Sequence, residues 1–216
     1  YGENSENVYY YLTVYNEPYV HPAEPENLDV EGLLKGIYLY SPASKKHKKN
    51  AQILASGVGV NWALKAQQLL ADDWGVKASV WSVTSWNELR RDGLETDRHN
   101  LMNPKDKRTA YVTKKLKGAR GPVIAVSDYM RAVQDQISPW VEQPFYSLGT
   151  DGFGLSDTRG ALRRHFNVDA ESIAIAVLQQ LCDQGDIRQG TVTKAMEKYR
   201  IHDVSAADAG NTEGSG

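Results

Sequence analysis

Few side chains of this 216-residue chain stand in arrangements typical of catalysis. Ser156 does not stand in a nucleophile-elbow pattern, the glycine-flanked turn that exposes a catalytic serine in hydrolases. Cys182 lies in an amphipathic run without an evident catalytic base. The histidines are scattered, and none has a metal-ligand spacing with Cys182 or with another histidine: His21, His47, His99, His165 and His202. His99 lies in a charged run suited to chemistry, although a surface histidine is the simpler interpretation. The sequence therefore supports neither nucleophilic catalysis nor a structural zinc site.

The turn Gly57-Val58-Gly59 follows an apolar run and precedes a helical pattern, which is where a dinucleotide-binding loop would cradle a pyrophosphate. The pattern is incomplete, because Trp62 stands where close packing of the helix on the strand requires a third glycine. The alternative is a tight strand-to-helix turn that needs two small residues.

The most distinctive stretch is the glycine-rich loop Gly149–Asp157, in which Gly149, Gly152 and Gly154 permit unusual backbone angles. Phe153 offers an apolar anchor between two of these glycines, and Ser156 or Asp157 can cap the helix that follows. The loop, which also contains Asp151, could bind an anion or pack against another subunit. Composition favours a structural or interface loop.

A basic run, Lys45–Lys49, separates two predicted strands. An exposed basic loop without interleaved aromatic residues is usually a solvated turn, so we predict no nucleic-acid binding. The whole chain agrees, because 25 basic and 27 acidic residues give a formal net charge of -2.

The elements that must position these residues follow an α/β pattern. Strands are predicted at Gly36–Tyr40, Gln52–Ser56, Val76–Thr84, Val123–Val126 and Phe145–Leu148. The short connection between the first two favours an antiparallel pair. Alternation of these strands with helices predicts a mixed, mostly parallel five-stranded sheet with helices on both faces.

Helices are predicted from apolar spacing and from capping residues. Gly75 is a C-terminal stop, Ser85 and Glu88 form a capping box for a short helix, and Asp128 caps a helix through Ile137. The remaining predicted helices span Asn61–Ala71, Thr109–Leu116, Asp157–Phe166, Ala170–Asp183 and Thr191–Tyr199. The small, polar tail from residue 203 to 216 is expected to be disordered.

Composition is that of a globular protein, with 41% hydrophobic and 24% charged residues. A single cysteine excludes an internal disulfide and favours a reducing cytoplasm. The apolar runs are far shorter than a membrane span, and the N-terminus carries no signal pattern.

Several long stretches of the chain resemble one family in unbroken order from about Tyr1 to Ile201. They are YYLTVYNEPY at Tyr10–Tyr19, GLLKGIY at Gly32–Tyr38, VWSVTSWNELRRDG at Val80–Gly93, SDYM at Ser127–Met130 and LGTDGFGLSDTRGALRRHFNVDA at Leu148–Ala170. They are similar to the C-terminal region of the homodimeric bacterial pyruvate dehydrogenase decarboxylating component, a member of the transketolase superfamily.

The resemblance implies a domain division. Residues 1–19, with a strand at Val8–Tyr15, would end a preceding pyrimidine-binding domain. Residues 20–27, which carry two of the three prolines Pro18, Pro22 and Pro25, would form a linker, and residues 28–202 would form a transketolase C-terminal-like domain.

The family's full chain binds thiamine diphosphate and Mg²⁺ between its first two domains, across a dimer interface. It decarboxylates pyruvate and reductively acetylates the lipoyl group of a partner acyltransferase. The family's Gly-Asp-Gly magnesium motif is absent from this sequence, so we expect neither cofactor to bind these residues and no catalysis by them alone. By the resemblance, Asn16 and Glu17 would lie on the rim of the substrate channel, whereas Pro18 and His21 receive no role.

Two hypotheses follow from the sequence. The first is an assembly domain whose glycine-rich loop lies at a domain or subunit contact. The second is a free-standing regulatory module that binds a small ligand or anion at the Gly57–Asn61 or Gly149–Gly154 turn.

Overall fold

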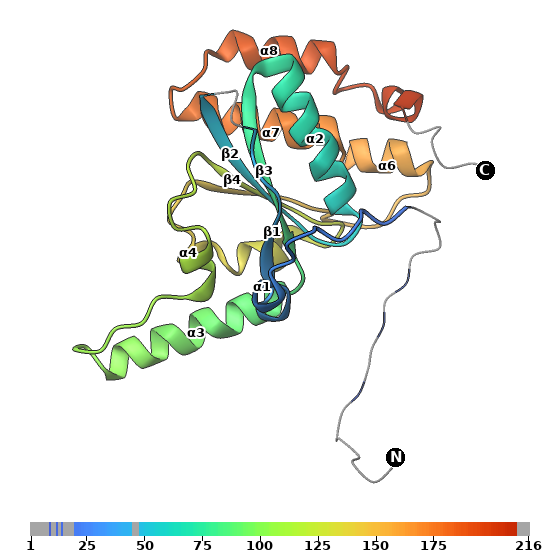
Figure 1. Cartoon of the computed structure of the whole chain (residues 1–216). Helices are drawn as coiled ribbons and strands as arrows, with labels where there is room; N and C mark the ends of the chain where they lie inside the picture. The colour runs from blue at the N-terminus through green and yellow to red at the C-terminus, as the bar shows by residue number, and fades with distance from the viewer. Residues whose placement is uncertain (1–8, 10–11, 13, 15–19, 45–47, 211–216) are drawn as a thin grey trace.

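The computed structural model describes all residues except 1–8, 10–11, 13, 15–19, 45–47 and 211–216. Its centre is a five-stranded sheet in the order β1-β3-β2-β4-β5 (Figure 1). The strands are β1 (Ile37–Ser41), β2 (Lys49–Ala55), β3 (Val76–Val83), β4 (Val123–Val126) and β5 (Phe145–Leu148). Only β1 runs antiparallel to its neighbour, β3, and all other pairs are parallel. The predicted fold class is confirmed.

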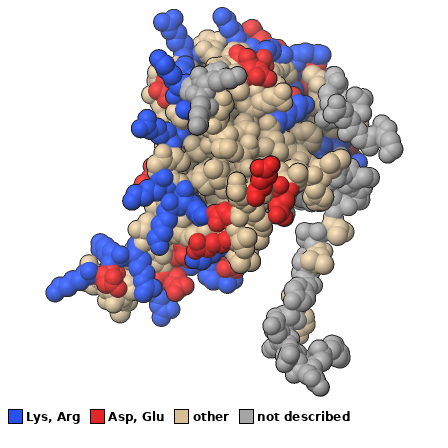
Figure 2. Space-filling model, viewed as in Figure 1, with Lys and Arg blue, Asp and Glu red and all other residues tan. Residues whose placement is uncertain are grey.

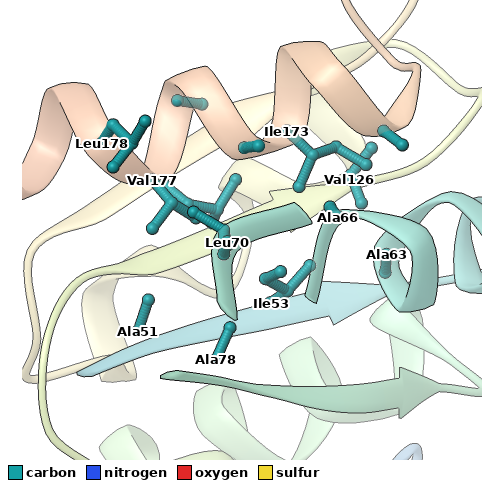
Figure 3. Close-up of a cluster of buried hydrophobic side chains, with 14 of the residues drawn as sticks. Ala51, Ile53, Ala63, Ala66, Leu70, Ala78, Val126, Ile173, Val177 and Leu178 are labelled. Carbon is teal, nitrogen blue, oxygen red and sulfur yellow. The ribbon is translucent and has the colours of Figure 1, made fainter. Parts of the chain in front are cut away.

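Successive side chains of a strand point to opposite faces of the sheet. Both faces of this sheet are apolar, and helices cover both. Ile53 and Ala55 of β2 belong to one buried cluster, with the helices α2 (Gly59–Trp74), α7 (Ala170–Asp183) and α8 (Gln189–Lys198). Figure 3 shows this cluster, in which Leu70 and Val177 meet over the sheet. Leu54 points the other way, into a second cluster.

The second cluster lies between the sheet and the shorter helices of the opposite face. Its helical residues include Leu89 and Val112, which come from α3 (Trp86–Met102) and α4 (Tyr111–Lys115). Ile137 joins them from the turn between α5 (Arg131–Asp135) and the 3-10 helix η1 (Ser138–Trp140). The sheet therefore shares its apolar side chains between two cores.

The predicted antiparallel pair of the first two strands is wrong. β1 pairs with β3 instead, and β3 lies between β1 and β2. A short connection does not force two strands to pair, because an extended residue spans about 3.3 Å whereas neighbouring strands lie only about 4.8 Å apart.

Two helix predictions agree with the structure at their ends. The backbone of Gly75 is left-handed at the end of α2, with φ of 62°. The Ser85 side chain caps α3 and accepts from the Glu88 amide at 3.1 Å. However, α3 is not short: it runs for 17 residues, and its outer half projects from the body of the molecule (Figure 1).

Other helix starts differ from the predictions. α5 begins at Arg131 with Met130 as its N-cap, so Asp128 does not cap it. α6 (Arg159–His165) is capped by Thr158 rather than by Ser156 or Asp157. In each case a residue nearer the helix occupies the capping position. A further short helix, α1 (Val30–Lys35), was not predicted and is capped by Asp29.

The ends of the chain are described only in part. Most of the predicted strand Val8–Tyr15 lies outside the described residues, and the division at residues 19 and 27 stays a prediction. Within the tail expected to be disordered, Val204–Gly210 form the 3-10 helix η2, which contacts α6, and residues 211–216 lie outside the described residues. Within the described residues, no helix is both long and apolar enough to cross a membrane.

Candidate functional site

The base of the glycine-rich loop is fixed to the turn that follows β4. The Thr150 amide donates to the carbonyl of Tyr129 at 2.8 Å, and the Thr150 hydroxyl donates to the carbonyl of Asp128 at 2.6 Å. Asp151 Oδ1 accepts from the Arg131 amide at 3.0 Å. Gly149 is buried in this contact, and a Cβ there would lie 2.4 Å from the Tyr129 carbonyl oxygen. The loop therefore leaves the sheet in a defined direction.

The tip of the loop, by contrast, faces solvent. Phe153 is 96% exposed and Leu155 is 53% exposed. Gly152 has φ of 92°, and a Cβ at Gly152 or Gly154 would meet nothing within 4 Å. Phe153 thus does not anchor the loop to the described part of its own chain, and its role as an anchor for another domain or subunit stays a prediction.

The rest of the predicted loop set lies in the exposed strand-to-helix connection. Asp157 Oδ1 accepts from the Thr158 amide at 2.7 Å and thereby supports the start of α6. Ser156 is exposed beside it. Among the described residues, neither side chain belongs to a cluster that could hold a metal ion.

The Gly57 turn borders a second feature, which we name the carboxyl-edge cavity because it lies at the carboxyl ends of the parallel strands β2 and β3. Its volume is about 720 Å³, and its lining includes His21, Tyr38, Gly57, Asn87 and Tyr129. Ligands of open α/β sheets bind at this edge. His21 received no role from the sequence, and no spacing rule could have placed it here, since it lies far from Gly57 along the chain.

The turn itself has the geometry of a tight strand-to-helix connection. Gly57 has φ of 56°, and the Gly59 amide donates to the Ser56 carbonyl at 3.0 Å. The Ser56 hydroxyl accepts from Trp86 Nε1 at 3.0 Å, which ties the turn to α3. A Cβ at Gly59 would lie 3.4 Å from the Val126 carbonyl oxygen, so small residues permit close approach to β4.

Metal-ligating side chains are not gathered in the described part of the chain. The described residues contain no group of three or more His, Cys, Asp or Glu side chains that could hold a metal ion. Cys182 donates to Gln189 Oε1 at 3.3 Å, and His99 Nε2 lies 2.8 Å from the Asp106 carbonyl oxygen, so both have local structural partners. Asn16 and Glu17 lie outside the described residues, and their place on a channel rim stays a prediction.

Comparisons with known proteins add independent findings. The model of the family described as "Transketolase-like TK C-terminal domain" matches residues 36–169. The pyruvate dehydrogenase E1 component of Mycolicibacterium smegmatis is 61% identical over 96% of this chain and 22% of its own length. That of Mycobacterium tuberculosis is 55% identical over 98% of this chain and 23% of its own length.

Among solved structures, transketolase from Leishmania mexicana aligns with 72% of this chain and 19% of its own, at 18% identity and a TM-score of 0.46. The chain spans less than a quarter of the length of the two mycobacterial relatives. Their names agree with the resemblance in the sequence and confirm it.

Proposed function

Because the chain belongs to the transketolase C-terminal domain family, we propose that it is the C-terminal assembly domain of a pyruvate dehydrogenase subunit. The identity of 61% to a pyruvate dehydrogenase E1 component supports this, as does the small share of that relative that the chain spans. In this proposal the full-length protein acts in the cytoplasm, decarboxylates pyruvate and reductively acetylates the lipoyl group of a partner acyltransferase.

Thiamine diphosphate and Mg²⁺ would bind to the full-length homodimer outside these residues, and the cofactor would supply the group that attacks pyruvate. We propose that this chain contributes a surface for contact with another domain or subunit. The observation that carries the assembly role is the exposed tip of the glycine-rich loop. A side chain as large and apolar as Phe153 is costly to leave in water, and aromatic residues are enriched at the centres of interfaces.

Phe153→Ala in the full-length protein tests this role. Loss of an anchoring aromatic side chain should raise the dimer dissociation constant by about tenfold or more, measured by sedimentation velocity over a dilution series. Leu34→Ala, which removes an apolar side chain 73% exposed on α1, is the matched control and should leave dimerisation unchanged. Unchanged sedimentation and unchanged thermal stability of the Phe153 variant would contradict the proposed assembly role.

The predicted lack of activity has its own test. The 216-residue chain, supplied with thiamine diphosphate, Mg²⁺ and pyruvate, should not reduce an artificial electron acceptor. Turnover by this chain alone would show that it carries a complete catalytic set.

A second candidate function is favoured by the carboxyl-edge cavity, whose volume of about 720 Å³ is that of a small-ligand site. A regulatory module would bind a nucleotide or phosphorylated metabolite there, beside Gly57. Calorimetry of the chain should then give saturable binding that Asn87→Asp abolishes, because the variant adds a negative charge to the cavity lining. The assembly role predicts no binding that depends on Asn87.

A further inference from the structure

A second cavity lies at the opposite edge of the sheet, where β2 and β3 begin. Its volume is about 560 Å³, and it shares no lining residue with the carboxyl-edge cavity. Lys48 and Lys77 lie at the starts of the two strands, and Lys115, Lys117 and Arg120 come from α4 and the turn that leads into β4. We call it the basic cavity. Figure 2 shows Lys and Arg side chains gathered on the side where Figure 1 places α4.

The charges of the basic cavity are not compensated by the described residues. Its lining contains five cations and no carboxylate. Among these five cations, Lys115 alone forms an ion pair with a described residue, Asp29. No ion pair to a described residue forms at Lys48, Lys77, Lys117 or Arg120, although the whole chain carries slightly more acidic than basic residues. Like charges that converge on one hollow repel each other, and a bound anion would relieve this repulsion.

The backbone of the wall that carries these cations is closely packed. Gln52 is only 5% exposed, and both ends of its amide are engaged. Its Oε1 accepts from Trp81 Nε1 at 2.9 Å, and its Nε2 donates to the Arg120 carbonyl at 2.9 Å. Gly121 has φ of 82°, and a Cβ there would lie 1.8 Å from the Asn50 carbonyl oxygen. The backbone of the turn that carries Arg120 is therefore pressed against β2, and the exposed Arg120 side chain extends from this fixed backbone.

These observations point to one class of ligand. We propose that the basic cavity binds a small anion that carries two or more phosphate groups. Arginine pairs with phosphate through parallel hydrogen bonds and lysine acts as a point charge, so the two residue types together suit such a group. A monocarboxylate would leave most of the four uncompensated charges unmatched. The volume of the cavity is also within the range of small-ligand sites.

The site is distinct from the sequence hypothesis for anion binding, which concerned the Gly57 and Gly149 turns. The sequence singled out the basic run Lys45–Lys49 only as a solvated turn. Lys48, a described member of that run, lies in the cavity beside Lys77, and Asn50 Nδ2 donates to the Lys48 carbonyl at 2.9 Å. The proposal does not depend on the assembly role, and either can fail alone.

Isothermal titration calorimetry of the 216-residue chain with inorganic pyrophosphate tests the site, with orthophosphate and acetate as weaker anions. Pyrophosphate should bind one site per chain, and more tightly than orthophosphate. Lys77→Gln combined with Arg120→Gln should weaken binding by about tenfold or more, since two charge-assisted contacts are lost.

The matched control is Lys105→Gln combined with Lys107→Gln, which changes the net charge equally on the exposed loop after α3. It should leave the affinity unchanged. Urea unfolding of both double variants confirms that they fold. Failure of the unsubstituted chain to bind pyrophosphate at millimolar concentration would overturn the proposal, and so would an equal loss of affinity in the control.

Discussion

Gly149 occupies a position with no room for a side chain. A Cβ there would lie 2.4 Å from the Tyr129 carbonyl oxygen and 3.0 Å from the Arg131 amide nitrogen, both of which belong to backbone. Gly149→Ala should therefore lower the free energy of unfolding by about 1–3 kcal/mol, measured by urea titration. Gly154→Ala is the control, because its Cβ would meet nothing within 4 Å. Equal stability of the two variants would contradict the close backbone contact of Gly149 with Tyr129 and Arg131.

At the scale of residues, the three loop glycines are equivalent in the sequence, yet the structure requires glycine at only two of them. Gly149 allows a close approach, Gly152 has a positive φ, and Gly154 has open space around it. The requirement at Gly149 comes from Tyr129, more than fifteen residues earlier, and the requirement at Gly152 comes from its backbone conformation. The sequence could therefore predict an unusual loop but not which of its glycines is structurally required.

At the scale of elements, α8 is held against the end of α2 by a polar contact. Tyr199 donates to Asp73 Oδ2 at 2.9 Å and accepts from Trp74 Nε1 at 2.7 Å, and Lys198 Nζ lies 2.6 Å from Asp73 Oδ1. Burial raises the pKa of the Asp73 carboxyl, but hydrogen bonds from Lys198 and Tyr199 outweigh burial and hold this pKa below 3.8. Folding is therefore coupled to ionisation of this group.

The sign of this coupling gives a pH prediction. Because the folded-state pKa of Asp73 is lowered, its contribution to stability is present above about pH 4 and is lost as the pH falls through the folded-state value. Asp73→Asn should be less stable than the unsubstituted chain at pH 7, and the difference should shrink on acidification below pH 4. Urea titrations across this range measure it. Asp186→Asn, at an exposed residue without an ion pair in the described structure, is the control for the loss of one carboxylate.

The outer half of α3 depends on local contacts. Asn100 Nδ2 donates to the Arg108 carbonyl at 2.9 Å, and Asn100 Oδ1 accepts from the Arg108 amide at 2.7 Å. Asn100→Ala should speed hydrogen exchange of the Arg108 amide by about tenfold or more, because the amide loses its acceptor. The urea midpoint of global unfolding should move little, because the outer half of α3 lies outside both cores. Asn87→Ala, at an exposed position of the same helix, is the control. A large loss of global stability would show instead that the outer half of α3 contributes to the packing of the whole domain.

Elements were predictable where the sequence pattern was local. The strands Val123–Val126 and Phe145–Leu148 and the helix Ala170–Asp183 were predicted at their observed bounds because their apolar runs are short or periodic. The outer part of α3 was missed because its residues are mostly polar and form no apolar stripe against the sheet. The pairing of β1 depends on where β3 inserts, which no local pattern reports.

At the scale of the whole molecule, alternation of strands and helices was enough to predict the sheet class, since parallel strands require crossover connections. The cavities were not predictable in the same way. Lys48, Lys77 and Arg120 are spread over more than seventy residues of sequence and converge only through strand order. Phe153 stands out in the sequence as an aromatic residue between glycines, but its exposure to solvent does not. That exposure depends on the direction in which the loop leaves the sheet, which the contact between Gly149 and Tyr129 sets.

The shared sheet also makes a prediction about cooperativity. Ile53 and Leu54 are neighbours on β2, both fully buried, and their side chains enter opposite cores. Ile53→Ala and Leu54→Ala should each cost about 2–5 kcal/mol in the free energy of unfolding. Because the sheet carries both cores, each variant should lose tryptophan fluorescence and helical circular dichroism in one coincident urea transition. Separate transitions in the Leu54 variant would show instead that the core under α3 and α4 melts while the core under α2 and α7 persists.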